Sequence, residues 1–528
     1  MNQYPVFPGQ DTLTHPTLRL PITTKTVTTE LNHDFTLPDY LPEIRKLLRV
    51  TATPLSEESY VGAASAEFSG GVRYNLLYVG ADGALWAAEF SVPYEFSIPF
   101  TLSDRCNPSL GIDAFESTHP ELLVTRVTSP RKFNVRCKLI STAEIYAESS
   151  LEEKLHGHAG SDIEHLHDEA DCAVILHGKS KGFPLSDEIL QDGQDNRNLR
   201  VISSEGQVFI SEANCEQDYT HLRGEVVLKL LVTHEDTSKE ELPSVLLRKI
   251  PFDATVETHG SDRYFEARGF GETETIHTSI EDGRILCDVT LSLTAECQKN
   301  RRFVYTEDLF STRAETDTVY ETIRFPFALK CGIGNFTFSE STPLEGLNLS
   351  AEDKILDVTG SFSKSEVTLK NDRLLCTGEG DFHLLVRNEQ SGEFSTLEIT
   401  LPFRYLTECN TDLPMLSDEI STHNLRVLPI TLRGKTDGER LAVEGELAVS
   451  MRVSSAQEKT ILTEAVIGSP YPKTKGMLRI YYPKGKETLW NAARHYHVSP
   501  KMLATSNGIS LSPKDPLDGI RFLTISEA

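Results

Sequence analysis

The segment GGVRYNLLYV at residues 70–79 decides the fold, because it returns twice further along the chain. It reads GEVVLKLLV at residues 224–232 and GEGDFHLLV at residues 378–386, so the leading glycines are 154 residues apart each time. In every copy a Leu-Leu pair lies six and seven residues after the glycine. Self-similarity at a fixed spacing is typical of an internal repeat, and a repeat sets the architecture.

Two further marks follow each copy in the same order. An apolar residue, a proline and an aromatic residue recur 23, 27 and 24 residues after the glycine, at Val92-Pro93-Tyr94, Ile250-Pro251-Phe252 and Leu401-Pro402-Phe403. Near the end of each repeat an apolar segment recurs, at Leu139–Glu144, Leu291–Glu296 and, in weaker form, Leu447–Ser450. We interpret the chain as three tandem repeats of about 154 residues.

The marked segments have the period of β-strands. Val289, Leu291 and Leu293 alternate with hydroxyl residues, as in a half-buried strand. Turn dipeptides stand beside such runs, at Asp82-Gly83, Asp282-Gly283 and Asp437-Gly438. Helical spacing is rare, and its best case is Glu43–Val50. The sequence therefore predicts a mainly β fold, with three tandem antiparallel domains that form an elongated scaffold.

Composition and charge exclude several classes of function. The chain has 528 residues, of which 52 are Lys or Arg and 78 are Asp or Glu, so its net charge is −26. Such a chain repels nucleic acid and anionic membranes. No stretch approaches the roughly 18 apolar residues of a spanning helix, and Met1–Pro16 lacks the pattern of a secretory signal. Nine scattered cysteines without a Cys-x-x-Cys motif favour free thiols in a reducing cytosol.

The residue composition and the pattern of apolar residues change after Gly468. A Pro/Lys-rich stretch at 469–476 reads as a linker, and Leu478, Ile480 and Tyr482 then alternate as a strand. Thr488 is a predicted N-cap of a first helix, and Ser499-Pro500 opens a second one. A last strand is expected from Ile520 to Ile525. The module is thus predicted to be a small βααβ unit.

These residues resemble a LysM module. The resemblance rests on Gly485, Thr488–Val498 and Leu503–Asn507, and it covers about 50 residues. The sequence departs from the family at Lys486-Glu487, because the family usually has Gly-Asp-Thr-Leu at this place. The departure alters the first loop, which borders the glycan groove in sugar-binding members.

The repeats in turn resemble the SPOCS domain of spore-coat proteins. Leu37–Ile44, followed by Leu47–Val50, looks like the opening of that domain. Three SPOCS-like repeats with a terminal LysM module resemble the SipL-type spore morphogenesis proteins of clostridia. The resemblance implies a protein of the mother-cell cytoplasm that helps to localise the coat around the forespore. It also implies that the LysM module docks the coat's basal-layer ATPase rather than a sugar.

These observations define the expected domains, which are an N-terminal tail 1–17, repeat 1 at 18–150, a His-rich linker 151–170, repeat 2 at 171–303, repeat 3 at 304–468, a linker 469–476 and the LysM module 477–528. From residue 469 onward the chain has nine Lys or Arg and four Asp or Glu, so the module carries +5 and the preceding 468 residues carry −31. A basic module on an acidic body favours an acidic partner surface.

The expected partner-binding residues lie around the two loops of the module, at Lys484, Lys486, Thr488, Trp490, Asn507, Gly508 and Ile509. Thr488 fixes the first loop, residues 507–509 form the second, and the two lysines add charge at the edge. For Trp490, which is one residue off the Leu489–Ala493–Tyr496 face, both an exposed interface anchor and a core position remain open.

A His-rich tract is the one metal-like feature, with His156, His158, His165, His167 and nearby Cys172. It lies among Gly, Ser, Asp and Glu, so a solvated linker without metal is the favoured reading. The sequence has no Gly-x-Ser-x-Gly, P-loop or His-Glu-x-x-His motif. We therefore expect a non-enzymatic adaptor without cofactor, with a peptidoglycan- or chitin-binding protein as the first alternative and an enzyme built on the repeats as the second.

Overall fold

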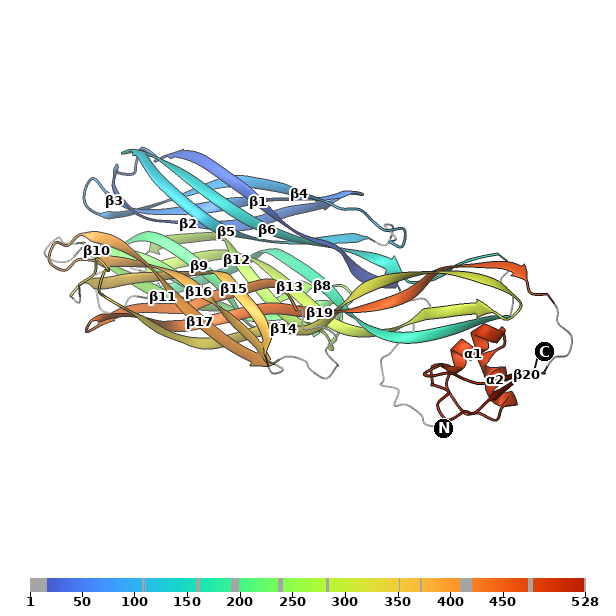
Figure 1. Ribbon diagram of the computed structural model, residues 1–528. Helices are drawn as coiled ribbons and strands as arrows, with labels where there is room; N and C mark the ends of the chain where they lie inside the picture. Colours follow the sequence, from blue (N-terminus) through green and yellow to red (C-terminus); the bar gives the residue numbers. More distant parts are fainter. Residues whose placement is uncertain are drawn as a thin grey trace.

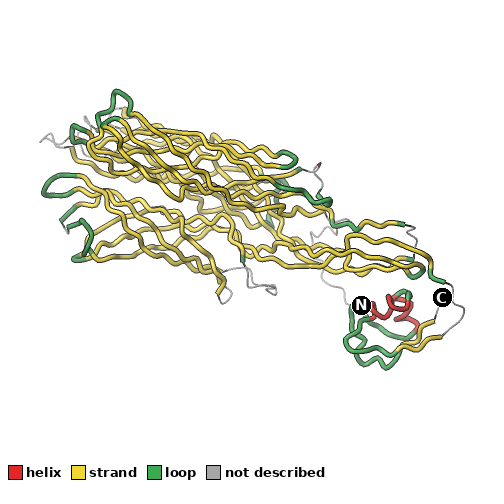
Figure 2. The backbone as a smooth tube through the Cα atoms, turned by 45° about the horizontal axis from the view of Figure 1, so that its top comes forward, coloured by secondary structure: helices red, strands yellow, loops and turns green. Residues whose placement is uncertain are grey.

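The computed structural model describes residues 17–106, 109, 111–157, 162–190, 199–235, 241–281, 284–350, 352–370, 373–408, 420–472 and 478–526. The expectations for the tail 1–16, for His158 and for the linker residues 473–476 lie outside this part of the chain. Within it the fold is mainly β, as predicted, and Figure 2 shows helices only in the small C-terminal module. In the described ranges the strands before that module form six sheets, antiparallel apart from one short strand, and the sheets pack in three pairs.

The first pair of sheets is called unit 1. One sheet has the order β1-β6-β5 and the other β2-β3-β4. The strands are β1 (Thr17–Thr36), β2 (Ile44–Val61), β3 (Ser65–Gly80), β4 (Leu85–Pro99), β5 (Ile112–Ser129) and β6 (Lys132–Ser150). Tyr74 of β3 and Phe133 of β6 share one buried core between the two sheets.

Unit 2 and unit 3 are built in the same strand order. Unit 2 has the sheets β8-β13-β12 and β9-β10-β11, and unit 3 has β14-β19-β18 and β15-β16-β17. The strands of unit 2 are β8 (Ile163–Leu190), β9 (Arg200–Glu216), β10 (Tyr219–Glu235), β11 (Glu241–Glu257), β12 (Glu266–Glu281) and β13 (Arg284–Ser311). Those of unit 3 are β14 (Ala314–Pro343), β15 (Lys354–Lys370), β16 (Arg373–Arg387), β17 (Phe394–Glu408), β18 (Ser421–Asp437) and β19 (Arg440–Pro470). Short β7 (Lys154–His156) pairs with β19 in parallel.

The repeated glycines lie on the central strands β3, β10 and β16, each directly opposite the aromatic residue of the Pro-aromatic mark. The register pairs are Gly70 with Tyr94, Gly224 with Phe252 and Gly378 with Phe403. At Gly70 a side chain has no room, because a Cβ would lie 2.3 Å from the carbonyl oxygen of Leu55 and 2.7 Å from the Tyr94 ring. At Gly224 a Cβ would lie 2.1 Å from the carbonyl oxygen of Phe209. Glycine therefore permits a close approach of neighbouring strands at these positions.

The two leucines of each pair have different surroundings. The first ones, Leu76, Leu230 and Leu384, lie in the cores of their own units. The second ones, Leu77, Leu231 and Leu385, meet in a single buried cluster. Adjacent residues of a strand point to opposite faces, so one leucine holds a unit together and the next joins the units. The units thus lie side by side against one another, as Figure 1 shows.

A buried group of charges also joins the three units. Arg452 of β19 forms ion pairs with Glu144 of β6 and Glu296 of β13, and Arg268 of β12 donates to Glu296 at 2.7 Å. All four side chains are at least nine-tenths buried. Burial alone raises the pKa of Glu296, but the two arginines outweigh it and the pKa is lowered. Removal of one partner would leave a buried charge uncompensated.

Four strands continue beyond the bundle as an extension, here called the arm (Figure 1). It consists of residues 163–171 of β8, 303–311 of β13, 314–323 of β14 and 461–470 of β19, with Ile163 opposite Ser311 and Ala314 opposite Pro470. Leu309, Leu462 and Ala465 are buried inside it. The arm carries the C-terminal module at its far end.

Three local expectations differ from the structure. Residues 44–50 of the expected short helix belong to strand β2, because Ile44 and Leu48 are covered by other strands and tertiary packing overrides a short helical period. Residues 163–170 of the expected linker are part of β8, where they pair with β13. The expected boundary at 303/304 falls inside β13, because this strand runs on into the arm.

Candidate functional site

The C-terminal module has the element order that the sequence predicts. Strands β20 (Leu478–Tyr481) and β21 (Leu523–Ser526) pair antiparallel around helices α1 (Leu489–Tyr496) and α2 (Pro500–Ser506). The Thr488 side chain caps α1 by accepting the backbone N–H of Asn491 at 3.2 Å, as predicted. Leu489, Ala493 and Leu503 are buried in the module's core.

Glu487 fixes the conformation of the first loop. Its carboxylate accepts the hydroxyl of Tyr481 and, at 3.0 Å, the backbone N–H of Lys484. These two hydrogen bonds lower the pKa of Glu487, the Tyr481 bond contributing most. The backbone carbonyl of Glu487 also accepts the N–H of Leu517 at 2.8 Å. The first loop is thereby held against Leu517, in the segment that follows the second loop.

The expected second-loop residues have mainly structural contacts. The Asn507 side chain donates to the carbonyl oxygens of Leu503 and Thr524, and it accepts the backbone N–H of Thr524, so it joins the end of α2 to β21. Gly508 has a φ of +65°, which favours glycine in this turn. The backbone N–H of Ile509 donates to Ala504, and its side chain packs against the module's core.

Trp490 is buried rather than exposed, with 3% of its surface accessible. Its indole N–H donates to Oδ2 of Asp308 in the arm at 2.7 Å, and its ring makes an edge contact with Phe310 at 4.9 Å between centroids. Of the two readings that the sequence left open for Trp490, the exposed anchor is therefore wrong. The side chain belongs to a contact between the module and its own chain, which sequence spacing does not reveal.

Two basic residues extend this contact. Arg494 of α1 pairs with Asp308, and Lys514 lies 2.8 Å from Asp168 and 2.6 Å from Glu307. Burial alone lowers the pKa of Lys514, but the two carboxylates outweigh it and raise the pKa. Arg494 and Lys514 of the module thus face acidic side chains of the arm. Sequence reasoning missed Arg494, Lys514 and all the arm residues, although the charge split pointed to an acidic surface.

Another face of the module stays open. Leu478, Ile480 and Tyr482 are 69%, 55% and 60% exposed, which is unusual for three apolar residues on one strand and its end. Phe522 lies beside Tyr482, with ring centroids 6.4 Å apart, and is also exposed. The expected partner residues Lys484 and Lys486 are exposed in the adjoining loop. An apolar strand face beside two lysines is therefore available for contact.

The described part of the His-rich tract has ordinary contacts. His165 and His167 stack at 5.7 Å on one face of β8, and His165 lies 3.5 Å from Glu153. Cys172 is buried in a separate core cluster. Among the described residues no group of three His, Cys, Asp or Glu side chains is arranged to hold a metal ion.

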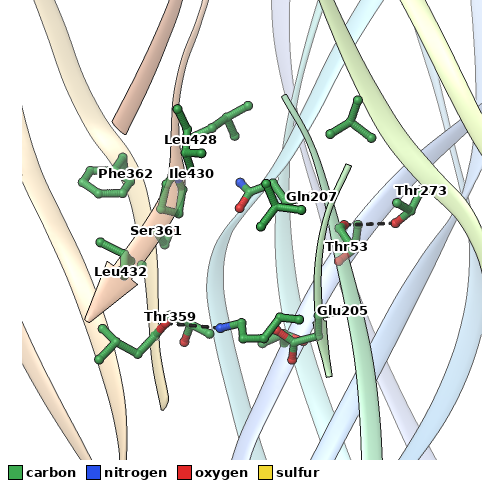
Figure 3. A pocket seen from close by; sticks show the side chains of 18 of the residues that line it. Thr53, Glu205, Gln207, Thr273, Thr359, Ser361, Phe362, Leu428, Ile430 and Leu432 are labelled. Carbon is green, nitrogen blue, oxygen red and sulfur yellow. Dashed lines mark hydrogen bonds between the residues drawn. The ribbon is translucent and has the colours of Figure 1, made fainter. Parts of the chain in front are cut away.

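A cavity of about 990 Å³ lies where the three units meet (Figure 3). Thr51, Glu205 and Thr359, which are 154 residues apart in sequence, line it together with Gln207 and Ile430. Its carboxylates are ion-paired: Glu205 and Asp357 lie 2.8 and 3.0 Å from Arg49, and Glu272 lies 3.5 Å from Arg426. Paired carboxylates are poor general bases, because the neighbouring cation stabilises the charged form.

Comparison of the chain with family models, with curated proteins and with solved structures finds no match. Within the described ranges, none of the helices combines the length and the apolar character that crossing a membrane requires.

Proposed function

We propose that this protein is a non-enzymatic adaptor in spore-coat assembly. In this proposal units 1 to 3 are three tandem SPOCS-like repeats, and the C-terminal unit is a LysM module. The LysM module docks the coat's basal-layer ATPase, and the protein works in the mother-cell cytoplasm at the forespore surface.

The repeat interpretation is supported by the matched registers. Each repeated glycine faces the repeated aromatic residue, and each second leucine enters the same shared cluster. The LysM interpretation is supported by the βααβ order and by the Thr488 cap. Both agree with the residues on which the two resemblances rest.

The docking role is carried by one observation, the exposed apolar face of Leu478, Ile480 and Tyr482 beside Lys484 and Lys486. Exposed aromatic and aliphatic side chains supply affinity in protein interfaces, and nearby charges steer the encounter. The ion-paired carboxylates of the cavity support a role other than catalysis.

The glycan-binding alternative predicts a free groove between the two loops. The backbone carbonyl of Glu487 instead holds the first loop against Leu517, and the nearby Lys514 pairs with Glu307 of the arm. These contacts favour a protein partner over a sugar.

The test is a pull-down of the basal-layer ATPase by the full chain and by the double variant Lys484→Glu, Lys486→Glu. We expect the reversal to weaken binding roughly tenfold at low salt, mainly through slower association, and the difference to shrink at high salt. The matched control reverses two exposed lysines of unit 3, Lys354→Glu and Lys370→Glu, and should bind like the wild type. Equal binding by all three proteins would contradict the docking face, and tight retention on purified peptidoglycan would favour the glycan alternative.

A further inference from the structure

The face of the module that meets the arm already binds a carboxylate in the structure. Oδ2 of Asp308 accepts the indole N–H of Trp490 and pairs with Arg494, while Oδ1 accepts the hydroxyl of Tyr320 at 2.6 Å. Asp308 is 8% exposed, so this carboxylate is buried and its partners are all in place.

An aromatic residue of the arm is bound to the module together with the Asp308 carboxylate. Phe310 is 2% exposed and makes the edge contact with the Trp490 ring. Residues two apart on a strand point to the same face, so Asp308 and Phe310 of β13 reach the module together. The bound segment is thus an aspartate followed two positions later by an aromatic residue.

We infer that Trp490, Arg494 and Lys514 form a recognition site for an acidic protein segment of the type Asp-x-aromatic, and that Asp308–Phe310 occupies this site as an internal competitor. This inference rests on the proposed docking role of the module. The arm occupies this site in the closed chain, and an acidic segment of the partner that docks on the open strand face replaces it.

Charge supports this exchange. The module carries +5 and its Lys514 faces Glu307 and Asp168, so the site favours a segment with more than one carboxylate. Exchange is feasible because the outer pairs are partly solvated: Lys514 and Glu307 are 37% and 41% exposed, and Arg494 is 36% exposed. Ion pairs at such exposure contribute little to stability and weaken in salt.

The first experiment opens the contact in the full chain. The opened variant combines Asp308→Asn and Glu307→Gln, which remove the two charges, with Trp86→Phe. Because the chain has two tryptophans, Trp490 is then the only one left. We expect the Trp490 emission to move to longer wavelength as its ring becomes solvated, and 1 M NaCl to have the same effect in the Trp86→Phe chain. The matched control Glu188→Gln removes an exposed carboxylate paired with Arg284 at 2.7 Å and should leave the emission unchanged. Unchanged emission in the opened variant would overturn the inference.

The second experiment measures binding of a synthetic peptide with the sequence of residues 305–312, YTEDLFST. The opened chain should bind it at least tenfold more tightly than the wild type, and Arg494→Gln should abolish the gain. Peptides with Asn for the aspartate or Ala for the phenylalanine are the controls and should bind at least tenfold more weakly. Equal binding by opened and closed chains, or equal binding of the control peptides, would overturn the inference.

A third experiment, binding of the basal-layer ATPase, separates this inference from the proposed function. If the basal-layer ATPase binds the opened chain more tightly than the wild type, both ideas are supported. If the peptide binds as expected but the ATPase binds neither chain, the recognition site stands and the docking role fails. If the ATPase binds both chains equally, the docking role stands and internal competition fails.

Discussion

Arg452 forms a buried ion pair with Glu296, and the two residues occupy the same place in the sequence repeat, five positions after Leu447 and after Leu291. Glu144 follows Leu139 by the same five positions and pairs with Arg452 as well. Equivalent positions of three repeats thus hold two acids and one base at a single point. Arg268 of unit 2, which also pairs with Glu296, supplies the second positive charge that balances the two acids.

Replacing Arg452 by leucine should destabilise the bundle strongly. The change leaves Glu144 and Glu296 buried with reduced compensation, which typically costs about 3–5 kcal/mol. The midpoint of urea unfolding measures the effect. Arg284→Leu, which breaks the exposed pair with Glu188, should cost less than about 1 kcal/mol. Similar midpoints for the two variants would show that the buried pairs contribute little.

Gly70→Ala and Gly71→Ala form a matched pair at adjacent positions. A Cβ at residue 70 meets the Leu55 carbonyl at 2.3 Å, whereas one at residue 71 meets nothing closer than 3.4 Å. We expect Gly70→Ala to destabilise by about 1–3 kcal/mol and Gly71→Ala to stay within about 1 kcal/mol of the wild type. The melting temperatures of both variants measure this difference in stability. If they melt together, close strand approach does not explain the repeated glycine.

The stability of the chain should fall as the pH drops below about 6.5, partly through His177. Burial lowers the pKa of His177 to about 3, the effect of Arg452 adding to it and that of Glu296 opposing it. Between these pH values the unfolded chain binds a proton at this residue and the folded chain does not, so stability decreases by up to about 1.4 kcal/mol per pH unit.

The substitution His177→Phe should flatten that pH dependence, because it keeps the stack on Phe115 and removes the titrating group. The measurement is the melting temperature between pH 7.5 and 5. His221→Phe, at a surface position, should retain the slope of the wild type. A slope that persists in His177→Phe would assign the pH dependence to other groups.

Trp490→Ala should destabilise the C-terminal module. The side chain is packed among Phe310, Leu489 and Ala493, and removal of a buried tryptophan typically costs about 3–5 kcal/mol. Tyr482→Ala, at a side chain that is 60% exposed, should have little effect. The protection of residues 489–506 from hydrogen exchange measures the effect of each substitution on the module's stability. Unchanged protection in Trp490→Ala would contradict the observed packing.

Treatment with EDTA should leave the melting temperature unchanged to within about 1 °C, because chelators denature only proteins whose folding depends on a metal. Of the described histidines in this tract, His165 lies 3.5 Å from Glu153 and stacks on His167. A drop of several degrees would assign a structural metal to the His-rich tract.

Most of the fold could be predicted from local signals in the sequence. Alternating apolar residues, the turn dipeptides and the Thr488 cap act within a few positions, so they predicted a β fold and the order of the terminal module. Helix 43–50 failed because three apolar residues at helical spacing also suit a strand whose two faces are both partly covered.

Contacts between residues far apart in the sequence could not be predicted from such local signals. Asp308 reaches Trp490 across 182 residues, and nothing near either residue distinguishes this pair from a free aspartate and a free tryptophan. The continuation of β8 and β13 into an arm was likewise hidden, because the tract at 163–170 is polar and its partner strand is far away in sequence. Among the expected partner-binding residues, Trp490 therefore lies on a face that the chain itself covers.

The shared leucine cluster has a consequence for biosynthesis. Leu77 and Leu385 are separated by 308 residues, which a ribosome adds in roughly 15–60 s at 5–20 residues per second. During this interval the first unit can complete its own core, but Leu77 has no partner from the last unit. A nascent chain therefore presents an adhesive patch that closes only when translation has passed β16, and a ribosome stalled earlier leaves a product prone to aggregation.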